Sequence, residues 1–179
     1  MSGLSGRPYE SEHAPYYGKY IALVEGHDAV AALELSTRES DALLTSITEE
    51  RSHHRYAPEK WSLREVFLHI SDVERVFSYR ALRIARGDET PLEGFDPDSW
   101  MHRAGADARH WSDLAHEVRS VRGATLSLFE SLPHEAWTRT GTADDNPVSV
   151  RALAFMIAGH DAHHRRASSR KNICSRTRP

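Results

Sequence analysis

The stretch from Ser62 to Gly87 constrains the fold most, because it contains a helix start, a continuous apolar face and a helix stop. Ser62 and Glu65 form an S-x-x-E capping box, in which each side chain can satisfy a free N–H of the first turn. Gly87 can adopt the left-handed conformation that ends a helix. Apolar residues recur between them at helical spacing: Leu63, Val66, Phe67, Ile70, Val73, Phe77 and Ile84. The sequence therefore predicts a long amphipathic helix that must bury one face.

Three further segments show helical periodicity, over about 28–50, 112–131 and from about 148 onward. Asp28 can cap the first of them. No segment shows a convincing strand pattern. The irregular segment 88–110 separates the second and third helices, and a connection of this length inside a domain often has a function. These features predict an all-α fold, a four-helix bundle with a long crossover between helices 2 and 3.

The expected organisation has three parts. Residues 1–27 are rich in Pro, Gly, Tyr and charge and predict an extended N-terminal arm. Residues 28–168 form the bundle domain. Residues 169–179 are basic and poor in apolar side chains, which predicts a disordered tail.

Bulk properties exclude several function classes. The 179 residues suit one domain, and the net charge of −3 with a pI near 6.5 argues against a nucleic-acid-binding protein. No apolar run reaches the about 20 residues of a membrane helix, and the N-terminus lacks the apolar core of a secretory signal. Cys174 is the single cysteine, which excludes an internal disulfide and favours a reducing, cytoplasmic location.

Three of the twelve histidines fall on predicted inward faces. His160 and His164 lie one helical turn apart and extend the apolar stripe of the last helix, while His69 lies on the apolar face of the second. Burying an unsatisfied polar group costs about 1–3 kcal/mol, so three inward imidazoles in one core are hard to satisfy by hydrogen bonds alone. One divalent metal ion would satisfy all three, and the core of a helical bundle is a usual place for such a site.

Spacing leaves some assignments open. His163 also follows His160 on the same helix, although the phase of the apolar stripe favours His164. The motif is not H-E-x-x-H, because position 161 is Asp, so a metalloprotease with a helical Glu base is disfavoured. Three nitrogen ligands leave coordination positions open, as in catalytic sites. Asp72, one turn beyond the histidine of the second helix, and Asp161 are candidates to orient a ligand.

Four segments resemble the DinB-like (YfiT-like) metalloenzyme superfamily: YAPEKWS from Tyr56, EVFLHISDVERVFSYRALRIARGD, PLEGFD and SVRALAFMIAGHDAHH. The resemblance extends from roughly Arg7 to His164. It implies a four-helix bundle with a long crossover, frequent dimerisation, and a zinc, nickel or similar ion held by three histidines at the positions of His69, His160 and His164. The family name does not imply DNA binding.

The resemblance also implies a chemistry, because characterised relatives include S-transferases and isomerases that use mycothiol or bacillithiol. The first hypothesis is therefore a metal-dependent transferase that activates a low-molecular-weight thiol for attack on a small electrophile. Arg80, Arg83 and Arg151 are candidates to bind carboxylates of the thiol or substrate. The alternatives are a metal-dependent hydrolase and a non-catalytic metal-binding stress or interaction protein.

Overall fold

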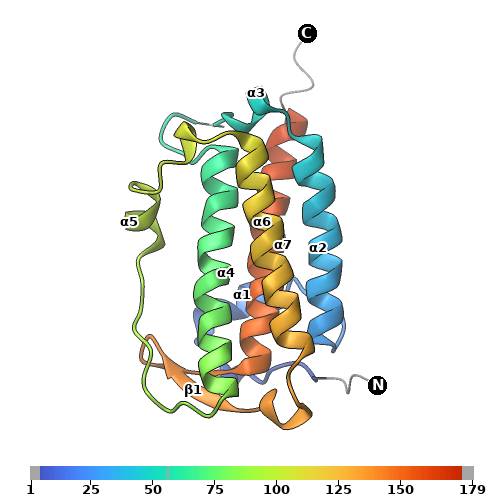
Figure 1. Ribbon diagram of the computed structural model, residues 1–179, viewed down its shortest axis with the longest axis vertical. Coiled ribbons are helices and arrows are strands. Elements are labelled where there is room, and N and C mark those ends of the chain that lie inside the picture. Colours follow the sequence, from blue (N-terminus) through green and yellow to red (C-terminus); the bar gives the residue numbers. More distant parts are fainter. Residues whose placement is uncertain (1–4, 56, 175–179) are drawn as a thin grey trace.

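The computed structural model describes residues 5–55 and 57–174, with side chains through Ser168. Four long helices form the bundle: α2 (Ala29–Ser46), α4 (Leu63–Ala85), α6 (Trp111–Glu130) and α7 (Val150–Cys174). The crossover between α4 and α6 returns along the length of the bundle, so these two neighbouring helices run in the same direction (Figure 1). The predicted all-α four-helix bundle with a long crossover is confirmed.

Helix α4 begins as predicted. The N–H of Glu65 donates to Ser62 Oγ at 3.2 Å, and the N–H of Ser62 donates to Glu65 Oε2 at 2.7 Å, which completes the capping box. The helix ends at Ala85, and Gly87 adopts a φ of 80° just beyond it. This long helix forms one wall of the core along its whole length.

The first predicted helix is divided in two. Asp28 caps α2 by accepting from the N–H groups of Val30 and Ala31, but α2 ends at Ser46. Ile47 is buried in an extended conformation, and Thr48 then caps a separate one-turn helix, α3 (Glu49–Ser52). The predicted end near residue 50 was therefore wrong, because the side chain of Thr48 competes for the backbone N–H of Arg51.

The N-terminal segment is folded rather than extended. It forms the short helices η1 (Glu10–Glu12), η2 (Pro15–Tyr17) and α1 (Gly18–Ile21), and α1 packs against α7. Tyr20 and Ile21 are buried, and Ile21 belongs to the same hydrophobic cluster as the bundle core. No helical period is visible in this part of the sequence, because each helix is only about one turn long.

The segment before α7, where the sequence shows no convincing strand pattern, is a β-hairpin. Strands β1 (Thr140–Ala143) and β2 (Asn146–Ser149) pair antiparallel, with Thr140 opposite Ser149. Asp144 and Asp145 both have positive φ, as the type I′ form of a two-residue hairpin turn requires. Four residues per strand are too few for a clear alternation, which explains why the sequence did not indicate them.

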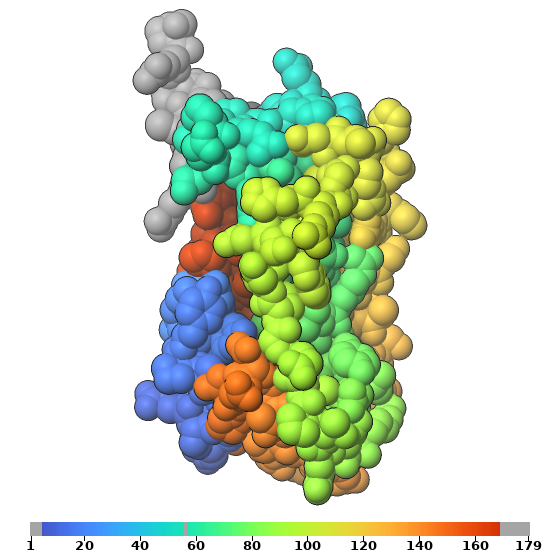
Figure 2. Space-filling model, turned by 90° about the vertical axis from the view of Figure 1, so that its left-hand side faces the viewer, coloured from blue at the N-terminus to red at the C-terminus, as the bar shows by residue number. Residues whose placement is uncertain are grey.

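The crossover joins this hairpin and has structure of its own. Leu92 donates to the carbonyl of Thr142 at 3.0 Å and accepts from the N–H of Asp144 at 2.9 Å. Further along lie α5 (Pro97–Met101) and η3 (Ala106–Ala108), and η4 (His134–Ala136) lies between α6 and the hairpin. The crossover, the N-terminal segment and the hairpin share one face of the molecule (Figure 2).

Helix α7 lies at the centre of the bundle. Every residue from 150 to 162 is buried, because α1, α2 and α4 all pack against it. The helix continues to Cys174, so residues 169–174 are helical where the sequence predicted disorder, and 175–179 lie outside the described residues. Within the described residues, no helix combines the length and hydropathy needed to cross a membrane.

Candidate metal centre

Three imidazoles from two helices converge inside the bundle. His69 comes from α4, and His160 and His164 come from successive turns of α7. His160 Nε2 lies 3.1 Å from His69 Nε2 and 3.1 Å from His164 Nε2. Candidate ligand atoms of the three residues all lie within 4.8 Å of one another. His69 and His160 are buried, whereas His164 is partly exposed.

Aromatic side chains fix the orientation of these rings. The ring of Trp61, just before α4, lies 4.8 Å from that of His69. The ring of Tyr20 meets His160 edge-on at 5.3 Å, so α1 covers the histidines from the side of the N-terminal segment. Packing on both sides limits rotation of the imidazoles, as a preorganised site requires.

Burial keeps the two inner histidines neutral. It lowers the pKa of His69 to about 4, which the negative charge of Asp98 only partly opposes. Burial also lowers the pKa of His160 well below its ordinary value, and the neighbouring histidines add to this effect. At neutral pH both rings therefore carry a free lone pair, the form in which histidine binds metals.

The spacing of the nitrogens fits a shared ion. Two imidazole nitrogens about 2.0–2.1 Å from a tetrahedral zinc lie about 3.3 Å from each other, close to the 3.1 Å found for both contacts of His160. Hydrogen bonding alone satisfies the group less well, because an N–H on His160 Nε2 can be donated to only one of its two neighbours. The donor set thus fits one divalent ion and leaves coordination positions for a ligand, without selecting the metal.

His164, rather than His163, joins this group. His163 is exposed, and its ring lies 5.2 Å from that of Tyr20. The apolar stripe used to choose between them does not exist as a stripe, since α7 is buried on all sides through Ala162. The assignment follows instead from where the two side chains point beyond Ala162: His164 points to His160, and His163 is exposed.

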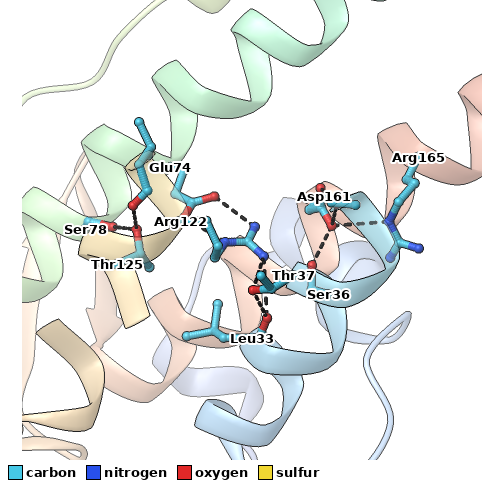
Figure 3. A network of polar contacts seen from close by, with 11 residues as sticks. Leu33, Ser36, Thr37, Glu74, Ser78, Arg122, Thr125, Asp161 and Arg165 are labelled. Carbon is cyan, nitrogen blue, oxygen red and sulfur yellow. Dashed lines mark hydrogen bonds and ion pairs between the residues drawn. The ribbon is translucent and has the colours of Figure 1, made fainter. Parts of the chain in front are cut away.

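The two candidate carboxylates are engaged elsewhere. Asp72 accepts a hydrogen bond from Arg75 at 3.1 Å, and burial raises its pKa. Asp161 accepts hydrogen bonds from Ser36 at 2.5 Å and Ser40 at 2.7 Å, both on α2, and contacts Arg165 (Figure 3). Within the described residues, neither aspartate joins the metal-binding group of histidines.

The three candidate arginines lie in different places. Arg80 lines a cavity together with His69 and His160. Arg83 forms an ion pair with Asp88 and donates to the hydroxyl of Tyr79 at 2.7 Å, on the outer side of α4. Arg151 forms an ion pair with Glu12 and anchors the N-terminal segment to the start of α7. Only Arg80 of the three is brought together with the histidines.

Two hollows flank the histidines. One has a volume of about 360 Å³ and is lined by His69, His160 and Arg80, by Phe77 of the predicted apolar face, and by aromatic residues that the sequence did not single out, namely Tyr16, Tyr17, Tyr20 and Phe95. The other, of about 530 Å³, is lined by Trp61, His163 and His164 among others. The missed tyrosines and Phe95 come from segments without helical periodicity, where no spacing points inward.

The fold and the site define a class, a four-helix-bundle protein in which three histidines from two helices are placed to share one divalent ion. The family model of the DinB superfamily matches residues 32–168. The chain therefore belongs to the DinB superfamily, as the sequence resemblance indicated.

Solved structures share this fold. YfiT from Bacillus subtilis, described as "a probable metal-dependent hydrolase with an unusual four-helix bundle topology", superposes with a TM-score of 0.72 at 17% identity, covering 94% of this chain and 93% of that one. A mycothiol-dependent maleylpyruvate isomerase superposes with a TM-score of 0.66 at 13% identity, covering 76% of this chain and 57% of that one. No functionally curated sequence matches the chain.

Proposed function

We propose that the protein is a metal-dependent enzyme that holds one divalent ion, zinc or nickel, through His69, His160 and His164, and transfers a low-molecular-weight thiol to a small electrophilic substrate. The observation that supports this most is the position of the histidines, because His69 and His160 lie at the wall of a cavity of about 360 Å³ and His164 lies beside them at the second hollow. A structural ion would be enclosed by protein ligands, whereas a ligand in this cavity can reach the group directly.

A bound divalent ion would lower the pKa of a thiol beside it, so that the reactive thiolate is available at neutral pH. The residues of the chain then have to place the electrophile. Burial raises the pKa of Tyr17, which therefore keeps its proton at neutral pH and can donate a hydrogen bond. The sulfur forms a bond to an electrophilic carbon while a bond from that carbon to a neighbouring atom breaks. That atom keeps the electron pair and takes up a proton, which Tyr17 can donate and solvent replaces, and the thiol proton leaves to solvent.

The hydrolase remains the second candidate, favoured by the description of the YfiT fold neighbour. A water molecule beside such an ion would keep a pKa of about 7, so hydrolysis benefits from a group that accepts its proton. The engagement of Asp72 with Arg75 and of Asp161 with Ser36 and Ser40 removes the two carboxylates that the sequence suggested from that task, whereas Asp98, whose charge acts on His69, lies in the hollow beside His164. Thiol transfer does not need such a base, because coordination deprotonates the thiol, and this difference favours the transferase.

A paired screen tests the proposal. Zinc-loaded, nickel-loaded and metal-free protein are incubated with mycothiol, bacillithiol, cysteine or glutathione and a panel of electrophiles, and in parallel with esters and amides. We expect thioether or isomerised products that depend on metal and are lost in His160→Ala, while His163→Ala retains activity. Metal-dependent ester or amide cleavage without any thiol reaction would establish the hydrolase instead, and inactivity of the metal-loaded protein in both panels would favour the non-catalytic alternative.

A further inference from the structure

The buried arginines of the chain differ in how their charge is balanced. Four arginines are buried among the described residues. Three of them form an ion pair with a glutamate: Arg64 with Glu49, Arg122 with Glu74 and Arg151 with Glu12. Arg80, which is only 3% exposed, forms no ion pair with any described residue. A buried cation without an anion carries a desolvation penalty that a bound anion would offset.

The contacts of Arg80 leave its charge uncompensated. Its Nη2 donates to the carbonyl oxygen of Glu93 at 2.6 Å, and the guanidinium lies 5.5 Å from the ring centre of Phe95 and 6.0 Å from that of Phe77. The nearby Tyr17 does not provide a negative charge, because burial raises its pKa more than Arg80 lowers it. The guanidinium has five N–H donors, so further donors remain for a ligand.

Arg80 and the histidines line the same cavity, with aromatic walls between them. Helical side chains tilt toward the N-terminus, so Arg80 reaches back over Phe77, toward His69. Phe77 lies eight residues from His69, which corresponds to about 12 Å along the helix. The guanidinium of Arg80 and the histidines are thus far enough apart for a small aromatic acid to lie between them, with its carboxylate at one end and its reacting atom at the other.

Asp144 also lines this end of the cavity and makes the field there less positive. Its carboxylate packs against the crossover, since a Cβ at Gly94 would lie 2.2 Å from Asp144 Oδ1. It forms no ion pair with Arg80 in the described part of the chain. An amine could therefore compete with an acid for this cavity, and the experiment includes one.

We propose that the substrate is a carboxylic acid with a flat apolar body, whose carboxylate is bound by Arg80 while its other end points to the histidines. This inference rests on the proposed function for the reaction, but the binding of the acid itself needs no metal. The rings of Tyr17, Phe77 and Phe95 form the apolar wall, and bidentate donation from Arg80 selects the carboxylate.

The probes are 3-phenylpropionate, its amide, the saturated analogue 3-cyclohexylpropionate and the amine 3-phenylpropylamine. Isothermal titration calorimetry measures their affinities for metal-free and metal-loaded wild-type protein. We expect the acid to bind at least about tenfold more tightly than the amide, and the phenyl acid more tightly than the cyclohexyl acid. If the wild-type protein binds the acid and the amide with equal affinity, or binds the amine more tightly than the acid, these titrations alone overturn the proposal.

Two variants on α4 locate the contact. Arg80→Gln should remove the preference for acid over amide, and Arg80→Lys should restore part of it, with circular dichroism showing a folded protein. Arg83→Gln is the matched control and should keep the preference for the acid. It removes the same charge three residues further along α4, where Arg83 pairs with Asp88 on the outer side of the helix. If Arg80→Gln is folded and keeps the preference, the inference is wrong. If the protein prefers the acid to the amide but binds no divalent ion even when one is added, the proposed function is wrong and the inference about the carboxylate stands.

Discussion

Gly159 of α7 contacts the backbone of Tyr20 in α1 so closely that a Cβ at position 159 would lie 2.1 Å from the carbonyl oxygen of Tyr20. Glycine is required at position 159 because no side chain fits there, and not because the backbone adopts a left-handed conformation. The contact holds the N-terminal segment against the centre of α7, directly beside His160, on which the ring of Tyr20 packs.

Gly159→Ala should therefore separate α1 from α7. A methyl group that meets backbone atoms cannot be accommodated by a rotamer change, so we expect a loss of about 1–3 kcal/mol in the free energy of unfolding. Urea unfolding measures this loss. Gly123→Ala is the control, because nothing lies within 4 Å of a Cβ there in the middle of α6, and alanine should stabilise that helix by about 0.5–1 kcal/mol. Equal effects of the two substitutions would contradict the close contact.

Removal of each histidine ligand should reduce metal content. Protein purified without a nickel column should contain about one divalent ion per chain by elemental analysis. His69→Ala, His160→Ala and His164→Ala should each lower this occupancy with helical content retained, whereas His163→Ala should not. A metal-free wild-type protein that also fails to bind added zinc or nickel would remove the basis of the proposed site. Loss of metal on replacing His163 but not His164 would reverse the assignment within α7.

The ion pair of Glu12 and Arg151 should make stability depend on pH. Burial would raise the pKa of Glu12, but hydrogen bonds from Arg151 and Ser149 outweigh it and lower the pKa below the ordinary 4.5. Stabilisation by Glu12 is thus fully present above pH 4.5 and is lost as the pH falls through the lower folded-state value.

Glu12→Gln should accordingly destabilise the protein by about 2 kcal/mol at pH 7. The difference from wild type should shrink below pH 4.5, where the wild-type carboxyl becomes protonated and resembles the amide. Thermal unfolding across this range provides the measurement. Glu10→Gln, an exposed change in the same short helix, should show no comparable pH-dependent difference. A constant difference at all pH values would mean that the charge of Glu12 does not matter.

The buried pair of Glu74 and Arg122 should be the most sensitive polar contact in the core. Arg122 Nε and Nη2 each donate to Glu74 at 2.8 Å, and Arg122 also reaches Thr37 on α2 (Figure 3). Glu74→Gln leaves a buried cation and should cost about 3–5 kcal/mol in unfolding free energy. The double variant Glu74→Leu/Arg122→Met should recover most of this loss. Asp41→Asn, at the exposed pair with Arg119, should cost at most about 1 kcal/mol.

The sequence predicted those features that depend on local chemistry. The capping box of Ser62 and Glu65 and the stop at Gly87 placed α4 to within a residue or two, and the proline and glycine pattern marked the crossover. His69 and His160 were identified as inward-facing because each continues an apolar surface. These features could be read because the residues that determine them lie within a few positions of one another.

The remaining features depend on contacts between distant segments. The N-terminal segment folds because Tyr20 packs at Gly159, and the hairpin is extended by Leu92 of the crossover. Neither contact has a periodic pattern. The pairing of Asp161 with Ser36 and Ser40 has no local sequence signal either, so the sequence alone leaves its carboxylate as a candidate for the metal site. The same limit hid the cavity, whose walls come from five separate segments.

That cavity also connects ligand binding to folding. Its lining includes Tyr17 from the N-terminal segment, Arg80 from α4, Phe95 from the crossover and Asn146 from the hairpin. These segments come together only in the folded chain, so a molecule that fills the cavity binds the native state and has no comparable site in the unfolded one. By mass action, each increase in its concentration above the dissociation constant raises the unfolding temperature. A melting curve can therefore identify ligands of this protein before any reaction has been observed.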